Sequence, residues 1–323
     1  MDLPGDLFTT NGGVFSRAQV LALGETDRTL ARAVRAGDVV RLRHGAYVRA
    51  VDLAAVDERG WHLLLARAVL SRLPGRVALA GPSAALARGF AVWGHDLSKV
   101  HVVRLDAGSG RHESGVVHHR VAAGEVDVEL VDGLLAVDPR NAVWQVALLS
   151  SVESTVVTAD SALHLMPDLA GPLHDLAQQS QRHPHSRTAR LALRLVDGRA
   201  ESPGESLTRV ACFRHGIPKP DLQHDVRGED GRFLGRTDFW WEACNHLGEF
   251  DGRVKYERLL RKGETPSDAV VSEKRREDEM RATGKGMSRF TWAEVQPGAA
   301  SVRMARLAHE LEQSTRLYVR AGR

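Results

Sequence analysis

The first fifty residues contain two short helical patterns followed by a tight hairpin, and this order restricts the fold more than any other feature of the chain. Ser16 and Thr26 are good N-cap residues for helices over residues 17–23 and 27–36, and a glycine directly follows each helix. Residues 39–48 read as two strands around a glycine turn. Helix, turn, helix and hairpin is the order of a winged helix-turn-helix, whose second helix enters the DNA major groove.

The second predicted helix carries arginines along one face. Arg28, Arg32 and Arg35 are spaced at intervals of about one turn, opposite Leu30 and Val34, which we expect to face inward. A row of guanidinium groups suits phosphates and guanine edges in a major groove. The hairpin adds three more candidate DNA contacts: Arg41, Arg43 and His44. The alternative is a solvated helix face, the usual role of a run of charges.

The charge balance requires any nucleic-acid interface to be local. The chain has 44 Lys and Arg against 41 Asp and Glu, so its formal net charge is only +3. Between residues 28 and 49, however, six arginines face a single acid, Asp38. The field that could attract DNA is therefore concentrated in this segment.

Two stretches of the segment, Gly12–Arg17 and Arg41–Tyr47, read GGVFSR and RLRHGAY. On these residues it resembles the amino-terminal winged-helix domain of AbiEi-type antitoxins, and residues 81–85 and 138–140 are weakly similar to elements found behind such domains. The resemblance implies sequence-specific DNA binding and leaves room for autorepression. It is also consistent with a toxin protein as a partner.

Length and changes in pattern predict a multidomain α/β (α+β) protein. At 323 residues, two or three domains are expected. We predict a winged-helix DNA-binding domain over residues 1–50, a mixed α/β middle domain over 51–196 and a third domain over 197–323. In the middle domain His118 and His119 are adjacent, so on a strand they point to opposite faces and do not share a metal ion. We expect this domain to give structural support, to dimerise or to bind a partner.

The cysteines and the hydropathy pattern indicate the compartment. Neither Cys212 nor Cys244 belongs to a CxxC pair, so we interpret both as buried free thiols and exclude a thiolate zinc site. The chain has no apolar run of ~20 residues, and its start lacks the regions of a signal peptide. We therefore expect a cytoplasmic protein with no membrane partner.

A cluster of acids lies on an expected strand–turn–strand hairpin near the carboxyl end. Asp238 is on its first strand, Glu249 and Asp251 share one face of its second strand, and Lys255 follows. Carboxylates that converge on one point, with a cation beside them, hold Mg²⁺ (or Mn²⁺) against a phosphodiester. The alternative for Asp238 is an ion pair with Arg236 on the same strand.

Glu205 has two interpretations. Ser202-Pro203-Gly204-Glu205 is a capping box, in which Glu205 would bond back to the Ser202 amide. Alternatively, Glu205 faces the hairpin carboxylates from the first turn of its helix, with Arg209 pairing with it or with a phosphate.

On Glu205, Arg209, Asp238 and the stretch Glu249–Gly252, the third domain resembles the very-short-patch-repair branch of the PD-(D/E)xK endonuclease superfamily. Residues 273–278 and 289–292 are similar to that family as well. The resemblance implies a restriction-endonuclease-like sheet flanked by helices and Mg²⁺-dependent phosphodiester hydrolysis. The chain departs from the pattern at Asp251, where the family has lysine.

The leading hypothesis is thus a DNA-binding protein with a Mg²⁺-dependent endonuclease domain. Asp238 and Glu249 would bind the metal with help from Asp251, while Glu205 would act through water or as a further ligand. Lys255 would be the electrostatic or base partner. The alternative is a non-enzymatic AbiEi-type antitoxin or transcriptional regulator with a degenerate nuclease fold, which could bind a toxin or a second copy of itself. A third hypothesis is an interaction scaffold.

Overall fold

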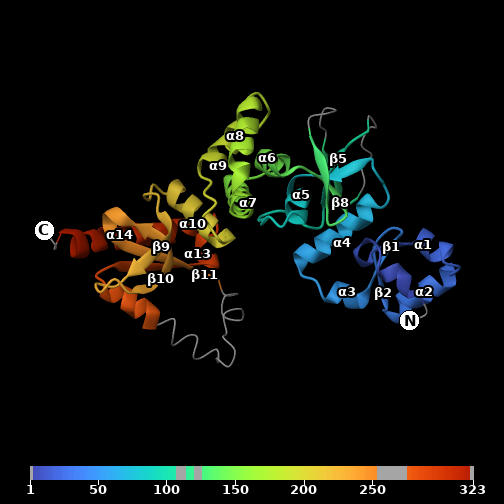
Figure 1. The fold of residues 1–323 in the computed structure, drawn as a ribbon, viewed down its shortest axis with the longest axis horizontal. Helices are drawn as coiled ribbons and strands as arrows, with labels where there is room; N and C mark the ends of the chain where they lie inside the picture. The colour runs from blue at the N-terminus through green and yellow to red at the C-terminus, as the bar shows by residue number, and fades with distance from the viewer. Residues whose placement is uncertain (1–2, 107–113, 120–125, 253–274, 321–323) are drawn as a thin grey trace. The chain divides into compact units, whose positions relative to one another are not determined.

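The computed structural model describes four stretches of the chain: residues 3–106, 114–119, 126–252 and 275–320. The chain divides into two compact units, each with its own sheets and helices (Figure 1). The first comprises Met1–Ser154 and Asp168–Arg190, and the second comprises Thr155–Pro167 and Leu191–Arg323. The division into three domains stays a prediction.

Two helices and three short strands form the amino-terminal segment. β1 (Phe15–Ser16) leads into α1 (Arg17–Ala22), and α2 (Asp27–Ala36) leads into the hairpin of β2 (Val39–Arg43) and β3 (Ala46–Arg49). The sheet order is β1-β3-β2, with antiparallel pairing. The two predicted helices and the hairpin are confirmed, whereas β1 was not predicted.

Local chemistry explains the helix boundaries. Ser16 forms a capping box with Gln19, and the Thr26 hydroxyl accepts the backbone N–H of Thr29. Gly37 ends α2 with a φ of 78°, in the left-handed region that glycine adopts without strain. These caps could be recognised from the sequence because each involves residues within one helical turn.

The inward face of α2 differs from the prediction by one residue. Leu30 is 4% exposed, as expected, but Val34 is 37% exposed. Ala33 takes the inward position, and with Leu30 it belongs to a core that includes Phe15 and Val39. The expectation for Val34 was wrong because positions i+3 and i+4 both lie near residue i on a helix, and packing chooses between them.

The larger sheet of the first unit has five strands in the order β6-β5-β4-β8-β7. Its strands are β4 (Val77–Leu79), β5 (Val100–Arg104), β6 (Val116–His119), β7 (Val128–Val131) and β8 (Leu134–Val137). β4–β5 and β7–β8 are antiparallel pairs, while β4–β8 and β5–β6 are parallel. The sequence predicts strands over residues 77–80, 100–104 and 116–120, which β4, β5 and β6 confirm, but the β7–β8 hairpin was missed. Its Asp132-Gly133 tip has positive φ at both residues, a recognised hairpin signal.

Helices surround this sheet and continue beyond it. They are α3 (Ala50–Ala54), α4 (Glu58–Leu70), α5 (Gly81–Ala87), α6 (Pro139–Leu149), α7 (Val152–Leu165), α8 (Ala170–Gln179) and α9 (Ser186–Arg194). The apolar pattern predicts a helix over residues 61–73, but α4 begins three residues earlier, because the Asp57 side chain caps it by accepting the Gly60 N–H. α7 belongs to the first unit up to Ser154 and to the second unit from Thr155.

The second unit is built around a four-stranded sheet in the order β12-β11-β10-β9. Its strands are β9 (Asp221–Arg227), β10 (Phe233–Trp241), β11 (His246–Asp251) and β12 (Gly286–Thr291). β11 and β12 are parallel, and the other pairs are antiparallel. The helices are α10 (Pro203–Arg214), α13 (Trp292–Val295) and α14 (Ala300–Ser314), and residues 275–282 are also helical. The sequence predicts strands over residues 221–226, 233–241, 247–251 and 287–291, and each is confirmed within about one residue.

Aromatic side chains fill the core between this sheet and its helices. Phe239 and Phe290 are fully buried, with ring centroids 5.6 Å apart in an edge-to-face arrangement. In the first turn of α10, Gly204 lies so close to Phe250 that a Cβ there would stand 2.0 Å from the ring. The two cysteines are free thiols, as predicted, but only Cys212 is buried. Among the described residues, no helix is long and apolar enough to cross a membrane.

Candidate functional site

The arginine face of α2 is exposed as predicted. Arg28, Arg32 and Arg35 are all exposed, on the side of the helix away from the buried Leu30 and Ala33. At the start of the same helix, Asp27 is held by Arg17 in an ion pair of 2.6 Å, and the hydrogen bond from Arg17 lowers the pKa of Asp27. The acid at the start of α2 is thereby neutralised. The face is cationic and open to a polyanion.

The β2–β3 hairpin presents a second group of cations. Arg41 and His44 are exposed, and the Arg41 Nη2 lies 2.7 Å from the His44 Nδ1. Arg41 Nε also donates to the Arg43 carbonyl at 3.3 Å, and Arg43 is half-buried. Arg49 has a structural role instead, because it pairs with Asp52 at 2.6 Å. Arg41 and His44 are therefore the exposed cations of the hairpin, while Arg43 and Arg49 are half-buried.

In the second unit, the sheet brings the predicted acids together. Phe239 of β10 pairs with Gly248 of β11, and the Phe250 N–H donates to the Asp238 carboxylate at 2.7 Å. Asp238 therefore lies beside Glu249 on the neighbouring strand. Asp251, two residues further along β11, projects to the same side as Glu249. Three of the predicted site residues thus occupy one region of the sheet.

The alternative interpretation of Asp238, an ion pair with Arg236, is wrong. Arg236 Nε donates to Asp225 of β9 at 2.9 Å instead. Arg236 and Asp225 are direct partners in the β9–β10 register. Side chains directly opposite each other on antiparallel strands are closer than those two residues apart on one strand, so the cross-strand acid captures the arginine.

Two arginines that sequence reasoning missed surround Glu249. The Arg276 Nη2 lies 2.6 Å from one Glu249 carboxylate oxygen, and the Arg289 Nη2 lies 3.5 Å from the other. Arg289 is the partner of Glu249 in the parallel β11–β12 register, and it also pairs with Glu277 at 2.8 Å. The Glu249 side chain is only 12% exposed. Both arginines lie in or beside the stretches similar to the endonuclease family, but nothing in their own spacing marks them as partners of Glu249.

Glu205 is held by the capping network. It is 2% exposed, and its carboxylate accepts the Ser202 hydroxyl at 2.7 Å and the Gln223 side-chain amide at 2.9 Å. The backbone donor is Glu201, at 3.0 Å, rather than Ser202 as predicted. Ser202 caps the helix by accepting the Glu205 N–H at 3.3 Å, whereas the reciprocal bond of the predicted capping box is not formed.

Arg209 does not pair with Glu205. It forms an ion pair of 2.7 Å with Asp160 of α7, and the two side chains are 5% and 1% exposed. Asp160 also accepts the Ser206 hydroxyl and the Asp197 N–H, each at 2.7 Å. Burial raises the pKa of Asp160 to about 6, against the opposing effect of Arg209. The expectation for Arg209 was wrong because its partner comes from a helix that the sequence does not connect with α10.

Lys255, the predicted electrostatic partner, lies outside the described residues. Within the parts of the chain that the structure describes, no group of three or more His, Cys, Asp or Glu side chains is arranged to hold a metal ion. The geometry therefore offers two sites of different character. One is an exposed cationic face, and the other is an acidic cluster partly neutralised by arginine.

Several known proteins match part of this chain. Two uncharacterised proteins of Mycobacterium tuberculosis, from strains CDC 1551 / Oshkosh and H37Rv, are each 29% identical to the chain over 175 residues. The match covers 50% of this chain and 63% of each relative. A crystal structure of the RV2827C protein from the same species covers 62% of this chain and 77% of its own, at 18% identity and a TM-score of 0.38.

The family model described as "Transcriptional regulator, AbiEi antitoxin" matches residues 6–50. These residues include α1, α2 and the β2–β3 hairpin, and therefore every predicted DNA contact. At its amino terminus the chain carries a domain of the AbiEi antitoxin and transcriptional-regulator family.

Proposed function

We propose that this protein is a DNA-binding transcriptional regulator whose amino-terminal segment contacts DNA as a winged helix-turn-helix. The observation that carries the proposal is the row of exposed guanidinium groups on α2, opposite the buried face, within the residues that match the family model. In this arrangement α2 enters the major groove, and Arg41 and His44 of the hairpin contact the backbone beside it. The family description makes a toxin protein a second candidate partner.

DNA binding by the full chain, measured by fluorescence anisotropy on the DNA upstream of its own reading frame, tests this function. The triple variant Arg28→Gln, Arg32→Gln and Arg35→Gln should weaken DNA binding. The slope of the logarithm of the binding constant against the logarithm of the salt concentration should become shallower by about 0.9 for each phosphate that is no longer neutralised. The control carries Arg182→Gln and Arg187→Gln, two exposed arginines of the same unit away from α2. Equal affinity and equal salt slope in the triple variant and the control would refute the assignment.

A second candidate function is metal-dependent endonuclease activity. Two observations favour it: Asp238, Glu249 and Asp251 gather on adjacent strands, and the second unit has the element order helix, three strands, helix, strand. The resemblance to restriction-endonuclease-like domains implies a sheet flanked by helices, and in this sheet the last strand is parallel to the third. Carboxylate oxygens are the ligands that Mg²⁺ and Mn²⁺ prefer.

The electrostatics of the cluster oppose metal binding as the side chains stand. Arg276 and Arg289 engage both oxygens of Glu249, so the carboxylates do not fit a metal ion unless Arg276 moves away. Nicking of supercoiled DNA with Mg²⁺ or Mn²⁺, compared among wild type, Asp238→Asn and Glu249→Gln, tests this candidate. Hydrolase activity that both substitutions abolish would support the nuclease. If all three proteins bind DNA without cleaving it, the nuclease candidate is refuted and the regulator is the remaining function.

A further inference from the structure

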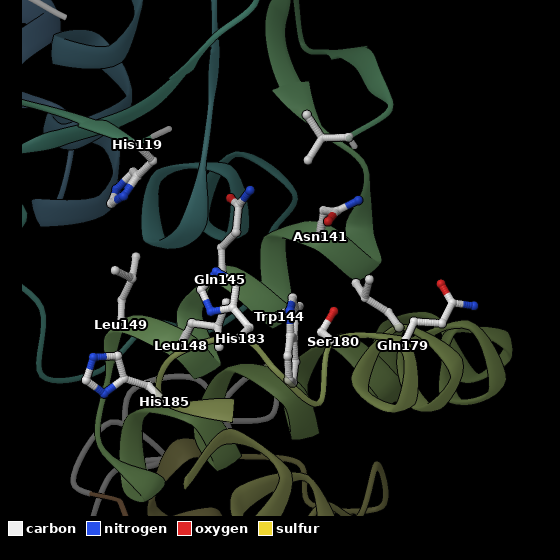
Figure 2. Close-up of a pocket in the computed structure, with 12 residues that line it drawn as sticks. His119, Asn141, Trp144, Gln145, Leu148, Leu149, Gln179, Ser180, His183 and His185 are labelled. Carbon is white, nitrogen blue, oxygen red and sulfur yellow. The ribbon is translucent and has the colours of Figure 1, made fainter. Parts of the chain in front are cut away.

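A pocket of about 480 Å³ opens in the first unit, lined by β6, α6, α8 and the α8–α9 connection (Figure 2). Its walls combine leucine side chains with an indole, three imidazoles, amides and a hydroxyl. The volume lies in the range of small-molecule sites, which are mostly apolar with a few oriented polar groups. The arginine face of α2 and the acidic cluster contribute nothing to this pocket, since none of their residues lines it.

The lining selects against a charged ligand. None of the lining residues that the structure describes carries a carboxylate, an ammonium or a guanidinium group. Burial, followed by the nearby His118, lowers the pKa of His119, so this imidazole is neutral at neutral pH. A cation that entered would lose hydration without gaining a counter-charge, which costs several kcal/mol, and an anion would meet no counter-charge apart from what the exposed imidazoles of His183 and His185 supply. An uncharged molecule has no such penalty.

Two polar side chains of the pocket are held in defined orientations. The Gln145 side-chain carbonyl oxygen accepts the Gly81 N–H at 2.9 Å. The NH₂ of the same amide is then the group of Gln145 that can donate a hydrogen bond to a ligand. The His119 Nε2 lies 2.9 Å from the Nδ1 of His101, and the two rings are stacked with centroids 5.1 Å apart. The His119 Nδ1 makes no hydrogen bond to the described residues. Figure 2 shows Gln145 and His119 among the side chains around the pocket.

The pocket also offers an aromatic wall. Trp144 of α6 is 4% exposed, and its indole borders the pocket beside Ser180 (Figure 2). Because so little of Trp144 is exposed, its indole supplies an apolar border to the pocket and not a free ring face on which a ligand could stack. The donor of Gln145 and the ring nitrogen of His119 are each able to hydrogen-bond to the polar edge of a planar nitrogen heterocycle.

We propose that this pocket binds an uncharged, planar nitrogen heterocycle of nucleobase size, with its polar edge on Gln145 and His119 and the apolar border at Trp144 and the leucines beside it. The proposal does not depend on the function of either site described above. The part of the first unit that follows the amino-terminal segment would then have a small-molecule site of its own, besides any supporting role.

Binding of adenine, hypoxanthine and uracil to the full chain tests the proposal, by saturation-transfer NMR and equilibrium dialysis. Adenosine 5′-monophosphate and inorganic phosphate serve as charged probes. Ser180→Trp fills the pocket from its half-buried wall, and Gln178→Trp, exposed on the same helix outside the pocket, is its matched control. Gln145→Glu keeps an acceptor for the Gly81 N–H but replaces the donor by a charge.

At least one neutral base should bind saturably, with affinity reduced about tenfold or more in Ser180→Trp and in Gln145→Glu and unchanged in Gln178→Trp. Circular dichroism establishes that each variant is folded. Three results would overturn the proposal: no neutral base binds at millimolar concentration, binding persists unchanged in Ser180→Trp, or the charged probes bind more tightly than the neutral bases.

Discussion

The buried imidazole of His246 predicts a specific loss of stability as the pH falls. His246 is 2% exposed, and its two ring nitrogens each lie 2.7 Å from a serine hydroxyl, Nδ1 from Ser314 and Nε2 from Ser288. Burial lowers the pKa of His246 from 6.5 to about 4, because the charged ring would be desolvated. The neutral ring is therefore part of the folded core of the second unit.

The size and sign of the effect follow from linkage between protonation and folding. A pKa lowered from 6.5 to about 4 corresponds to about 3 kcal/mol of unfolding free energy. Because the pKa of the folded state lies below that of the unfolded state, this stabilisation is fully present above pH 6.5. It is lost progressively as the pH falls from 6.5 to about 4, the interval in which the unfolded chain binds a proton that the folded chain does not.

Urea unfolding of wild type and of His246→Gln, followed by tryptophan fluorescence at pH 7 and pH 4, measures this effect. Trp241 is a nearby reporter, with its ring centroid 6.0 Å from that of His246. Wild type should lose about 3 kcal/mol more than His246→Gln between the two pH values. His309→Gln, at an exposed position of α14, is the control and should behave as wild type. Equal losses in wild type and His246→Gln would refute the reasoning.

Further substitutions test the packing and electrostatics of the acidic cluster. Gly204→Ala should destabilise the second unit by about 1–3 kcal/mol in thermal unfolding, because the new methyl group overlaps the Phe250 ring. Gly171→Ala, on α8 with open space around it, is the matched control and should be neutral or stabilising. Arg276→Met should cost about 1–3 kcal/mol in urea unfolding, because it removes the closer partner of the mostly buried Glu249. No change in Arg276→Met, or Mn²⁺ binding in wild type and this variant alike, would contradict the ion pair.

The elements of the second unit were predicted more closely than its contacts. The strands β9 to β12 follow from alternating apolar residues between turn signals, which act within a few positions of the chain. The ion pairs of Glu249 with Arg276 and Arg289 depend on how β11 pairs with β12 and on where the intervening helix packs. Neither follows from local propensity, so the arginines that neutralise the acidic cluster could not be recognised.

Sequence alone determined the amino-terminal segment, because its caps, glycine stops and arginine spacing are chemistry within one or two helical turns. It also brought Asp238, Glu249 and Asp251 into one hypothesis, through the period of two along a strand. Only the tertiary structure decided which cations meet these acids, that Arg209 pairs with Asp160, and that His119, Trp144 and Gln145 enclose a pocket. The physical reason is that ion pairs and cavities form between segments whose separation in the chain carries no information about their distance in space.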